Sequence, residues 1–277
     1  YSAIQDGLPI LIIYFFEPSV MAAPDASDRH WRFVYQSIKD LNQTLVGKTN
    51  SQNSVQIGHC EVADGFEHLS KSYAIHKIFS YQETGNGLTY RRDKEMYKWF
   101  SAEGIKWIEF QTNNVQRGRK NRNNWSKAYD ARMVTPEVLP DFKKAQLIEL
   151  DESLKRFLKA DTLPLNIVAK DARFQPGGES WAWKYLNSFL KDRVRNYSNG
   201  ISKPEWSRKT CSRLSPYLAW GNISMRSIFQ TVERSFDDIP NKRALFNWRS
   251  RLYWHCHFIQ KFEMEERYET ENVNRGF

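Results

Sequence analysis

Residues 211–218 combine the side chains that bind a phosphate anion. Their sequence is Cys-Ser-Arg-Leu-Ser-Pro-Tyr-Leu, so Ser212 and Ser215 supply hydroxyl groups and Arg213 supplies a guanidinium just before an expected helix. Backbone N–H groups at the start of a helix and a neighbouring arginine both favour a bound anion. The segment therefore predicts an anion site. The alternative interpretation is a serine that only caps the helix.

A second set of candidate residues lies in residues 245–267, which we expect to form one helix. Trp248, Arg251 and Trp254 are three residues apart, so they can share a helix face and line one wall of a cavity. The broad ring of Trp254 is suited to stacking on a base that has left the duplex. A buried structural tryptophan is the alternative interpretation.

The histidines and cysteines do not form the pattern of a metal site or a disulfide framework. His255, Cys256 and His257 are adjacent, but residues two apart on a helix point to different sides. Cys60 and Cys211 are far from Cys256 in the sequence. We therefore predict no metal site and a reducing, intracellular location, which is the cytoplasm if the protein is bacterial.

Basic residues are concentrated in residues 113–132. A single acid, Asp130, accompanies them, and Trp125 and Tyr129 lie among them. The six cations are Arg117, Arg119, Lys120, Arg122, Lys127 and Arg132. The whole chain has a formal net charge of +9, which favours an anionic partner. Nucleic acid is the first candidate for that partner.

Strand and helix patterns alternate in the first half of the chain. The apolar residues 8–16 are typical of a strand covered on both faces in a parallel sheet. Asp28 can cap a helix whose apolar positions recur at helical spacing. Those positions are Trp31, Val34, Tyr35, Ile38, Leu41 and Leu45. Strands at 55–62, 74–81 and 106–110 and helices at 65–72 and 90–102 follow. Residues 1–132 therefore predict a doubly wound α/β domain with a parallel sheet.

Helical patterns dominate the second half. Four prolines punctuate the region around residues 133–173, which predicts an irregular interdomain connector. Residues 174–277 then predict an all-α domain, with helices at 179–195, 216–236 and 245–267. The chain contains no apolar run near the roughly 20 residues that cross a bilayer, so we expect no membrane span.

In their order along the chain, these motifs resemble the photolyase/cryptochrome family. Residues 211–218, followed by Trp-Gly-Asn-Ile-Ser at 220–224, are similar to the family's Thr-Ser-Arg-Leu-Ser-Pro-Tyr-Leu segment, which holds the diphosphate of FAD. Weaker matches are spread over the chain. They lie at residues 83–85, 92–93, 114–118, 122–125, 177–179, 197 and 272–277.

The resemblance implies a photolyase-like α/β (antenna) domain without its first strand, then the connector and the N-terminal part of an all-helical FAD-binding domain that is incomplete at its C-terminus. Contacts with FAD are implied for Tyr197, Cys211, Ser212, Arg213, Leu214, Ser215, Trp248, Arg251 and His255. Contacts with the substrate are implied for Arg251 and Trp254. Residues of the electron-transfer chain are expected beyond Phe277. A folate or deazaflavin is implied as a possible antenna chromophore.

The implied activity is that of a deoxyribodipyrimidine photolyase, a carbon–carbon lyase. Such an enzyme is FAD-dependent and uses light to repair UV-induced pyrimidine dimers in DNA by electron transfer from reduced flavin. The expected partner is UV-damaged DNA and the expected state is a monomer; residues 1–277 alone are expected to be inactive.

Three positions depart from the family pattern. Arg251 replaces the acid that many cyclobutane-dimer photolyases use, His255 replaces their arginine, and Cys211 stands where threonine is usual. The first two favour an alternative, a cryptochrome-type blue-light photoreceptor with the same FAD pocket and no repair activity. A second alternative is a non-catalytic nucleic-acid-binding protein whose working surface is residues 113–132.

Overall fold

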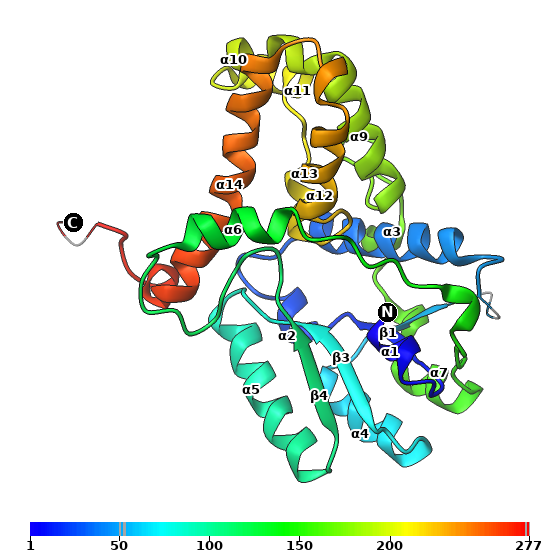
Figure 1. Cartoon of the computed structure of the whole chain (residues 1–277). Helices are drawn as coiled ribbons and strands as arrows, with labels where there is room; N and C mark the ends of the chain where they lie inside the picture. Colours follow the sequence, from blue (N-terminus) through cyan, green and yellow to red (C-terminus); the bar gives the residue numbers. More distant parts are fainter. Residues whose placement is uncertain (50, 52–53, 275, 277) are drawn as a thin grey trace. The chain divides into compact units, whose positions relative to one another are not determined.

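The computed structural model describes residues 1–49, 51, 54–274 and 276, and the chain divides into two compact units (Figure 1). Unit 1 consists of three segments: Tyr1–Phe79, Lys94–Ile108 and Val138–Trp181. Unit 2 consists of the other three: Ser80–Asp93, Glu109–Glu137 and Ala182–Phe277. The units alternate along the sequence, and the domain borders predicted at residues 132 and 173 stay predictions.

Two parallel strands lie at the centre of unit 1. β1 (Ile12–Phe15) pairs in parallel with β2 (Val55–Gly58). The helices around them are α1 (Ser2–Gln5), α2 (Pro18–Met21), α3 (Asp28–Leu45), α4 (Val62–Ser72), α7 (Glu152–Leu158) and α8 (Leu165–Val168). β1 is shorter than the predicted 8–16, because Pro9 has no N–H to donate to a ladder and Leu8 is 45% exposed.

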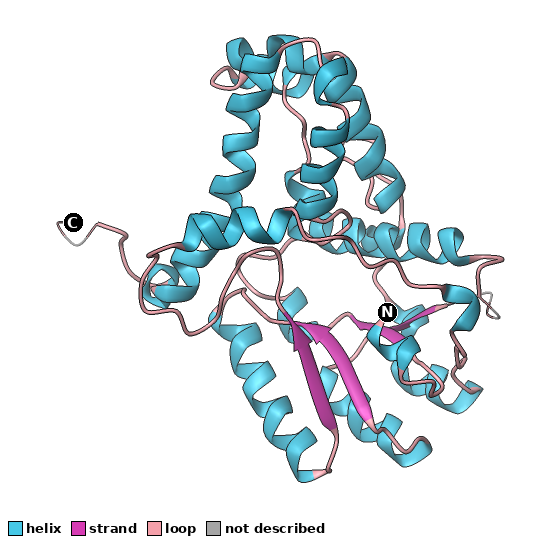
Figure 2. Ribbon diagram, viewed as in Figure 1, coloured by secondary structure: helices cyan, strands magenta, loops and turns pink. Residues whose placement is uncertain are grey.

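A second pair of strands is formed by β3 (Lys77–Tyr81) and β4 (Lys106–Phe110), with α5 (Gly87–Ala102) between them in the sequence (Figure 2). The residue before β3 accepts a hydrogen bond from Lys106 (3.2 Å), and the residue after β3 donates one to Phe110 (2.8 Å). Both strands therefore run in the same direction. The predicted strand–helix alternation is confirmed, whereas its continuation into one doubly wound sheet stays a prediction.

Helices cover both faces of β1, as its apolar sequence predicts. Ile12 and Tyr14 pack against the buried cluster that α3 and α8 share with the strand. Ile13 and Phe15 point the other way and pack against the leucines of α4 and α7. Because successive strand residues face opposite sides, one continuous apolar run supplies two hydrophobic surfaces.

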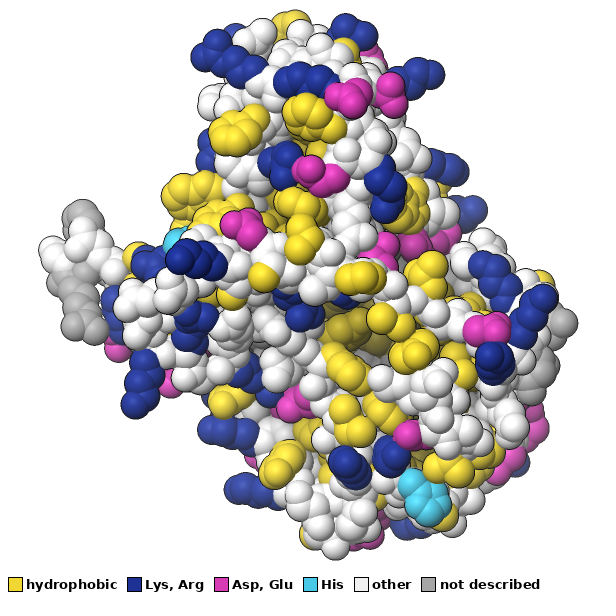
Figure 3. All heavy atoms as spheres, in the orientation of Figure 1, with side chains coloured by type: hydrophobic (Ala, Val, Ile, Leu, Met, Phe, Trp, Pro, Cys, Tyr) yellow, Lys and Arg dark blue, Asp and Glu magenta, His cyan; other side chains and the backbone are white. Residues whose placement is uncertain are grey.

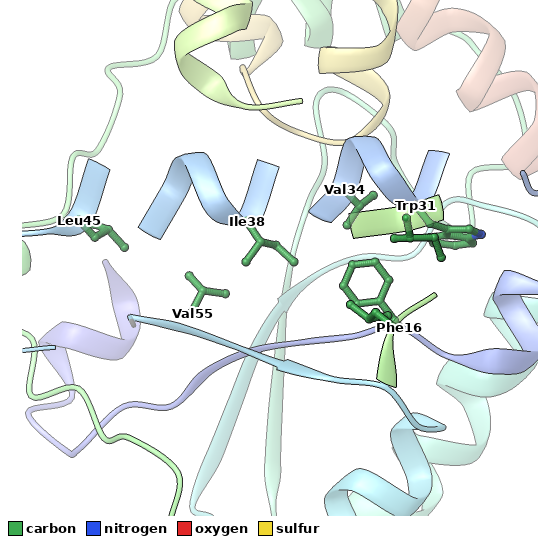
Figure 4. Packing of buried hydrophobic residues seen from close by; sticks show 8 residues of the cluster. Phe16, Trp31, Val34, Ile38, Leu45 and Val55 are labelled. Carbon is green, nitrogen blue, oxygen red and sulfur yellow. The ribbon is translucent and has the colours of Figure 1, made fainter. Parts of the chain in front are cut away.

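The amphipathic helix α3 is confirmed, with two corrections. Its buried side chains Trp31, Val34, Ile38 and Leu45 face Phe16 and Val55 in the core of unit 1 (Figure 4). Leu41 was expected on this face but is 38% exposed. The residue that caps α3 is Ser27 rather than Asp28, and its side chain makes no cap hydrogen bond.

Helices also occupy sequence in which we predicted none, and α6 and α7 are two examples. α6 (Trp125–Met133) lies in the basic segment, and it buries Trp125, Tyr129 and Met133, which are four residues apart. α7 lies in the predicted connector, where Leu150, Leu154 and Leu158 repeat the same spacing and are buried. In both segments, charged residues between the apolar ones hid the helical period.

The later part of unit 2 is helical. Its elements are α9 (Glu179–Lys191), η3 (Arg193–Asn196), α10 (Tyr197–Gly200), α11 (Pro204–Thr210), α12 (Ser215–Ala219), α13 (Met225–Arg234), η4 (Phe236–Asp238), α14 (Lys242–Met264) and η5 (Glu266–Glu269). The helix predicted at 216–236 is two helices, because Gly221 has φ +69° and Ser224 caps α13 by accepting from the N–H of Ser227.

The proposed family match at residues 272–277 includes Arg275 and Phe277, which lie outside the described residues. Over the part of the chain that is described, we find no helix with the length and apolar character needed to cross a membrane.

Candidate functional site

The predicted anion segment forms a tight loop between α11 and α12. Cys211 is extended and ends α11, and Leu214, which is 1% exposed, precedes the first turn of α12. Between them Arg213 has φ +61°, a left-handed conformation that is uncommon for residues other than glycine. Such a conformation persists only where the surrounding structure holds it.

Arg193, which follows α9, is the first of two residues that fix the loop by hydrogen bonds. Its guanidinium donates to the carbonyl of Cys211 and, at 3.5 Å, to that of Ser212. It also donates to the carbonyl of Tyr185 (2.6 Å) and the hydroxyl of Ser188 (2.9 Å) in α9. Arg193 could not be predicted from the sequence, since its role depends on the fold that brings residues 185–188 beside residues 211–212.

Trp248 of α14 is the second residue that fixes the loop by a hydrogen bond. Its indole N–H donates to the hydroxyl of Ser212 at 3.0 Å, and its ring packs on Phe189 with centroids 4.8 Å apart. Trp248 is 3% exposed, whereas Trp254 is 44% exposed. Two steps of three residues place Trp254 about 120° around the helix from Trp248, in keeping with their different exposures. That Trp248, Arg251 and Trp254 line one cavity wall stays a prediction.

Tyr197 and Arg251 meet beside the loop. Tyr197 is 3% exposed, and burial, followed by the nearby Cys211, raises the pKa of its hydroxyl to about 12. Arg251 hydrogen-bonds this hydroxyl and acts against that rise. Phe189 contacts both Tyr197 and Trp248. The structure thus brings together Tyr197, the 211–215 loop, Trp248 and Arg251. That they contact one cofactor stays a prediction.

The other predicted residues of the loop are Arg213 and Ser215. The guanidinium of Arg213 lies 5.9 Å from the ring centroid of Tyr185, on which Arg193 also rests at 5.8 Å. Ser215 is exposed at the first position of α12. Two guanidinium groups and two serine hydroxyls therefore lie around the loop, which is the chemistry of an anion site.

His255 is partly buried one turn beyond Arg251, and burial lowers its pKa. Its neighbour Cys256 is buried, and burial raises the pKa of that thiol to about 11, so it stays protonated at neutral pH. The described residues hold no group of three or more potential metal-ligating side chains.

We predict that His255 makes unit 2 sensitive to mild acid. A histidine whose pKa is lower in the folded state than in the unfolded state stabilises the fold. This contribution to the free energy of unfolding is fully present when the pH is above the unfolded-state pKa of 6.5. That contribution is lost as the pH falls through the lower folded-state value. Urea denaturation at pH 7 and pH 5 should show a smaller loss of stability in His255→Gln than in the unmodified chain. An identical loss in both proteins would contradict the prediction.

An exposed aromatic pair lies on α14 outside the loop. Trp254 and Phe258, which is 56% exposed, have ring centroids 5.4 Å apart. Trp254 was a predicted site residue and Phe258 was not, although their spacing of four residues indicates that they are neighbours on a helix. On the face drawn in Figure 3, hydrophobic and Lys or Arg side chains alternate over the helical part of the chain.

The basic segment is only partly a free cationic surface. Arg117 forms an ion pair with Glu109 at 2.8 Å, and Arg119 and Arg132 donate to backbone carbonyls within unit 2. Lys120 and Lys127 are exposed. Arg122, also exposed, contacts the ring of His257 on α14 (2.7 Å). Lys120, Arg122 and Lys127 are therefore the exposed cations of this segment, and its role as a working surface stays a prediction.

These features define a class of protein: an α/β part with parallel strands, and a helical part in which an arginine and a tryptophan hydrogen-bond the 211–215 loop. Solved structures of two photolyases and a cryptochrome share the fold. A bacterial class III photolyase from Agrobacterium tumefaciens is 17% identical, with a TM-score of 0.72 over 100% of this chain and 58% of its own. The cryptochrome from Synechocystis sp. PCC6803 is 17% identical, with a TM-score of 0.73 over 95% of this chain and 57% of its own.

The third structure is an archaeal photolyase from Sulfolobus tokodaii with two FAD molecules, 15% identical, with a TM-score of 0.69 over 99% of this chain and 58% of its own. The model of the DNA photolyase family matches residues 1–137. The match over residues 1–137 and the shared fold are those expected of a fragment of the photolyase/cryptochrome family. The chain spans somewhat more than half the length of these solved structures. A search of curated proteins finds no match.

Proposed function

We propose that the protein carrying this chain is a photolyase, which binds FAD and uses light to repair UV-induced pyrimidine dimers in DNA. In this proposal, unit 1 provides most of a doubly wound α/β domain and unit 2 provides part of the FAD-binding domain. The observation that carries the proposal is the 211–215 loop, in which Ser212 is held at its hydroxyl by Trp248 and at its carbonyl by Arg193.

The residues at this loop fit the diphosphate of FAD. Ser212 accepts the indole N–H of Trp248 and keeps its own hydroxyl proton to donate, and Arg213 supplies positive charge. Ser215, Tyr197, Arg251 and the backbone of Cys211 and Leu214 would surround the same group, with His255 further along α14. When bound, the reduced flavin would supply the light-driven electron transfer to the dimer.

The remaining parts of unit 2 would bind the damaged DNA. Trp254 offers an exposed ring for stacking on an extruded pyrimidine, and Arg251 lies one turn away with its side chain exposed. Lys120, Arg122 and Lys127 would contact phosphates, and those contacts would make binding dependent on salt. A folate or deazaflavin antenna would belong to the α/β domain.

A cryptochrome-type photoreceptor with the same FAD pocket is the second candidate function. It is favoured by Arg251, which hydrogen-bonds Tyr197 in place of the acid that many photolyases present to the lesion, and by the partly buried His255 in place of their arginine. One of the structures with this fold is a cryptochrome.

An absorption spectrum of the purified full-length protein, followed by repair assays on the same sample, tests the proposal. We expect flavin bands and light-dependent repair of cyclobutane or (6-4) dimers, with a sample kept in the dark as the control. Flavin bands without repair of either lesion would support the photoreceptor. A folded protein without flavin that still binds nucleic acid would contradict both candidates.

A further inference from the structure

Arg193 makes an unusual set of contacts for a partly buried cation. Its hydrogen-bond acceptors are the carbonyls of Tyr185, Cys211 and Ser212 and the hydroxyl of Ser188, and none of these groups carries a charge. The guanidinium also rests against the rings of Tyr185 and Phe189, 5.8 Å from each centroid. It therefore joins the end of α9 to the start of the anion loop.

No carboxylate is among these hydrogen-bond acceptors of Arg193, so they do not neutralise its positive charge. Burial lowers the pKa of the guanidinium, and the neighbouring Arg213 lowers it further. The acid that acts on it, Asp192, is exposed and lies 3.9 Å from Arg195 instead. Two arginines packed around one tyrosine ring repel each other, and a bound anion would relieve that repulsion.

The loop also has a conformation that needs support. Arg213 occupies the left-handed region, which is unfavourable for a residue with a side chain. Arg193 fixes the two carbonyls that come directly before Arg213, and an arginine can do this because its planar fork has five donors. A lysine could satisfy one or two of these acceptors but not all of them.

We propose that Arg193 is a positioning residue that shapes the 211–215 loop for the diphosphate of FAD and adds its charge to the affinity for that group. This inference rests on the proposed function, and it concerns the diphosphate rather than the flavin ring. It therefore predicts that loss of Arg193 weakens binding of FAD but not of riboflavin, which has no phosphate.

The test compares FAD and riboflavin binding to the full-length protein by flavin fluorescence. Arg193→Met, which removes the charge and the fork, should weaken FAD about 10- to 100-fold, as expected for charged hydrogen bonds. It should change riboflavin affinity by less than about threefold. The FAD affinity of Arg193→Lys should lie between those of the unmodified protein and Arg193→Met. Arg195→Met is the matched control, because Arg195 is an exposed arginine on the same turn and should bind FAD normally.

The outcomes separate this inference from the proposed function. If the unmodified protein binds neither FAD nor riboflavin, both the proposed function and this inference are wrong. If it binds both and Arg193→Met weakens them equally, or behaves like Arg195→Met, only the inference fails. Thermal melting accompanies each variant. If neither Arg193 variant folds, Arg193 is a structural residue and the proposal is overturned.

Discussion

Replacement of Gln260 by alanine is expected to lower the free energy of unfolding by about 3 kcal/mol. Gln260 is 0% exposed in α14, and both ends of its amide are bonded. Its Oε1 accepts from the backbone N–H of Gln116 (2.7 Å) and from the indole of Trp125 (3.2 Å), and its Nε2 donates to the carbonyl of Gln116 (3.0 Å). Alanine would leave these buried groups without that partner and would open a cavity.

Urea denaturation of two further variants completes this test. Gln260→Leu fills the space but makes no hydrogen bond. Its free energy of unfolding should therefore be lowered nearly as much as that of Gln260→Ala, which would show that the amide is responsible. Gln43→Ala makes the same truncation at an exposed helical position and should change stability little. A loss below about 1 kcal/mol for Gln260→Ala would contradict the prediction, since that is the range of one ordinary hydrogen bond.

The hydrogen bonds of Gln260 also fix part of the basic segment, residues 113–132. Gln260 fixes residue 116, and Asn114, which is 1% exposed, accepts the indole N–H of Trp125 at its carbonyl (3.1 Å). The loop that carries Lys120 and Arg122 is therefore tied at both ends to a buried layer. A cationic loop held in this way can present its charges in a fixed geometry.

Sequence patterns predicted the elements whose burial repeats at a clear period. α3 and β4 were placed correctly, because apolar residues recur every three or four positions in α3 and because β4 is bounded by turn residues. The apolar period of α6 was missed, since six basic residues in residues 113–132 made the segment resemble an exposed loop. Its three buried residues, Trp125, Tyr129 and Met133, have the spacing of one helix face.

The anion loop shows what local sequence can and cannot predict. The residue types at 211–215 predict an anion site, because hydroxyls and an arginine before a helix suit a phosphate wherever they occur. The left-handed Arg213, the bond from Trp248 to Ser212 and the role of Arg193 could not be predicted, since each depends on chain segments that are brought together only by the folded helices.

Replacement of Trp254 by alanine is expected to weaken binding of DNA that contains a pyrimidine dimer by about 10- to 100-fold, the range for loss of an aromatic ring that stacks on a base. The ring is 44% exposed and contacts Phe258 and His257 on its own helix, so its removal should affect the fold little. Covering a large, exposed apolar ring with a ligand is favourable, because it removes apolar surface from water.

A matched pair of proteins and a matched pair of ligands decide the outcome. Trp206 of α11 is 52% exposed, so Trp206→Ala removes an equally accessible tryptophan away from α14 and should bind damaged DNA normally. Both variants are titrated, at one fixed salt concentration, with a duplex that carries a single dimer and with the same duplex undamaged. Stacking on an extruded pyrimidine requires that Trp254→Ala lose affinity for the damaged duplex only, because phosphate contacts from Lys120, Arg122 and Lys127 act on both. Equal losses on the two duplexes would instead make Trp254 part of a general nucleic-acid surface.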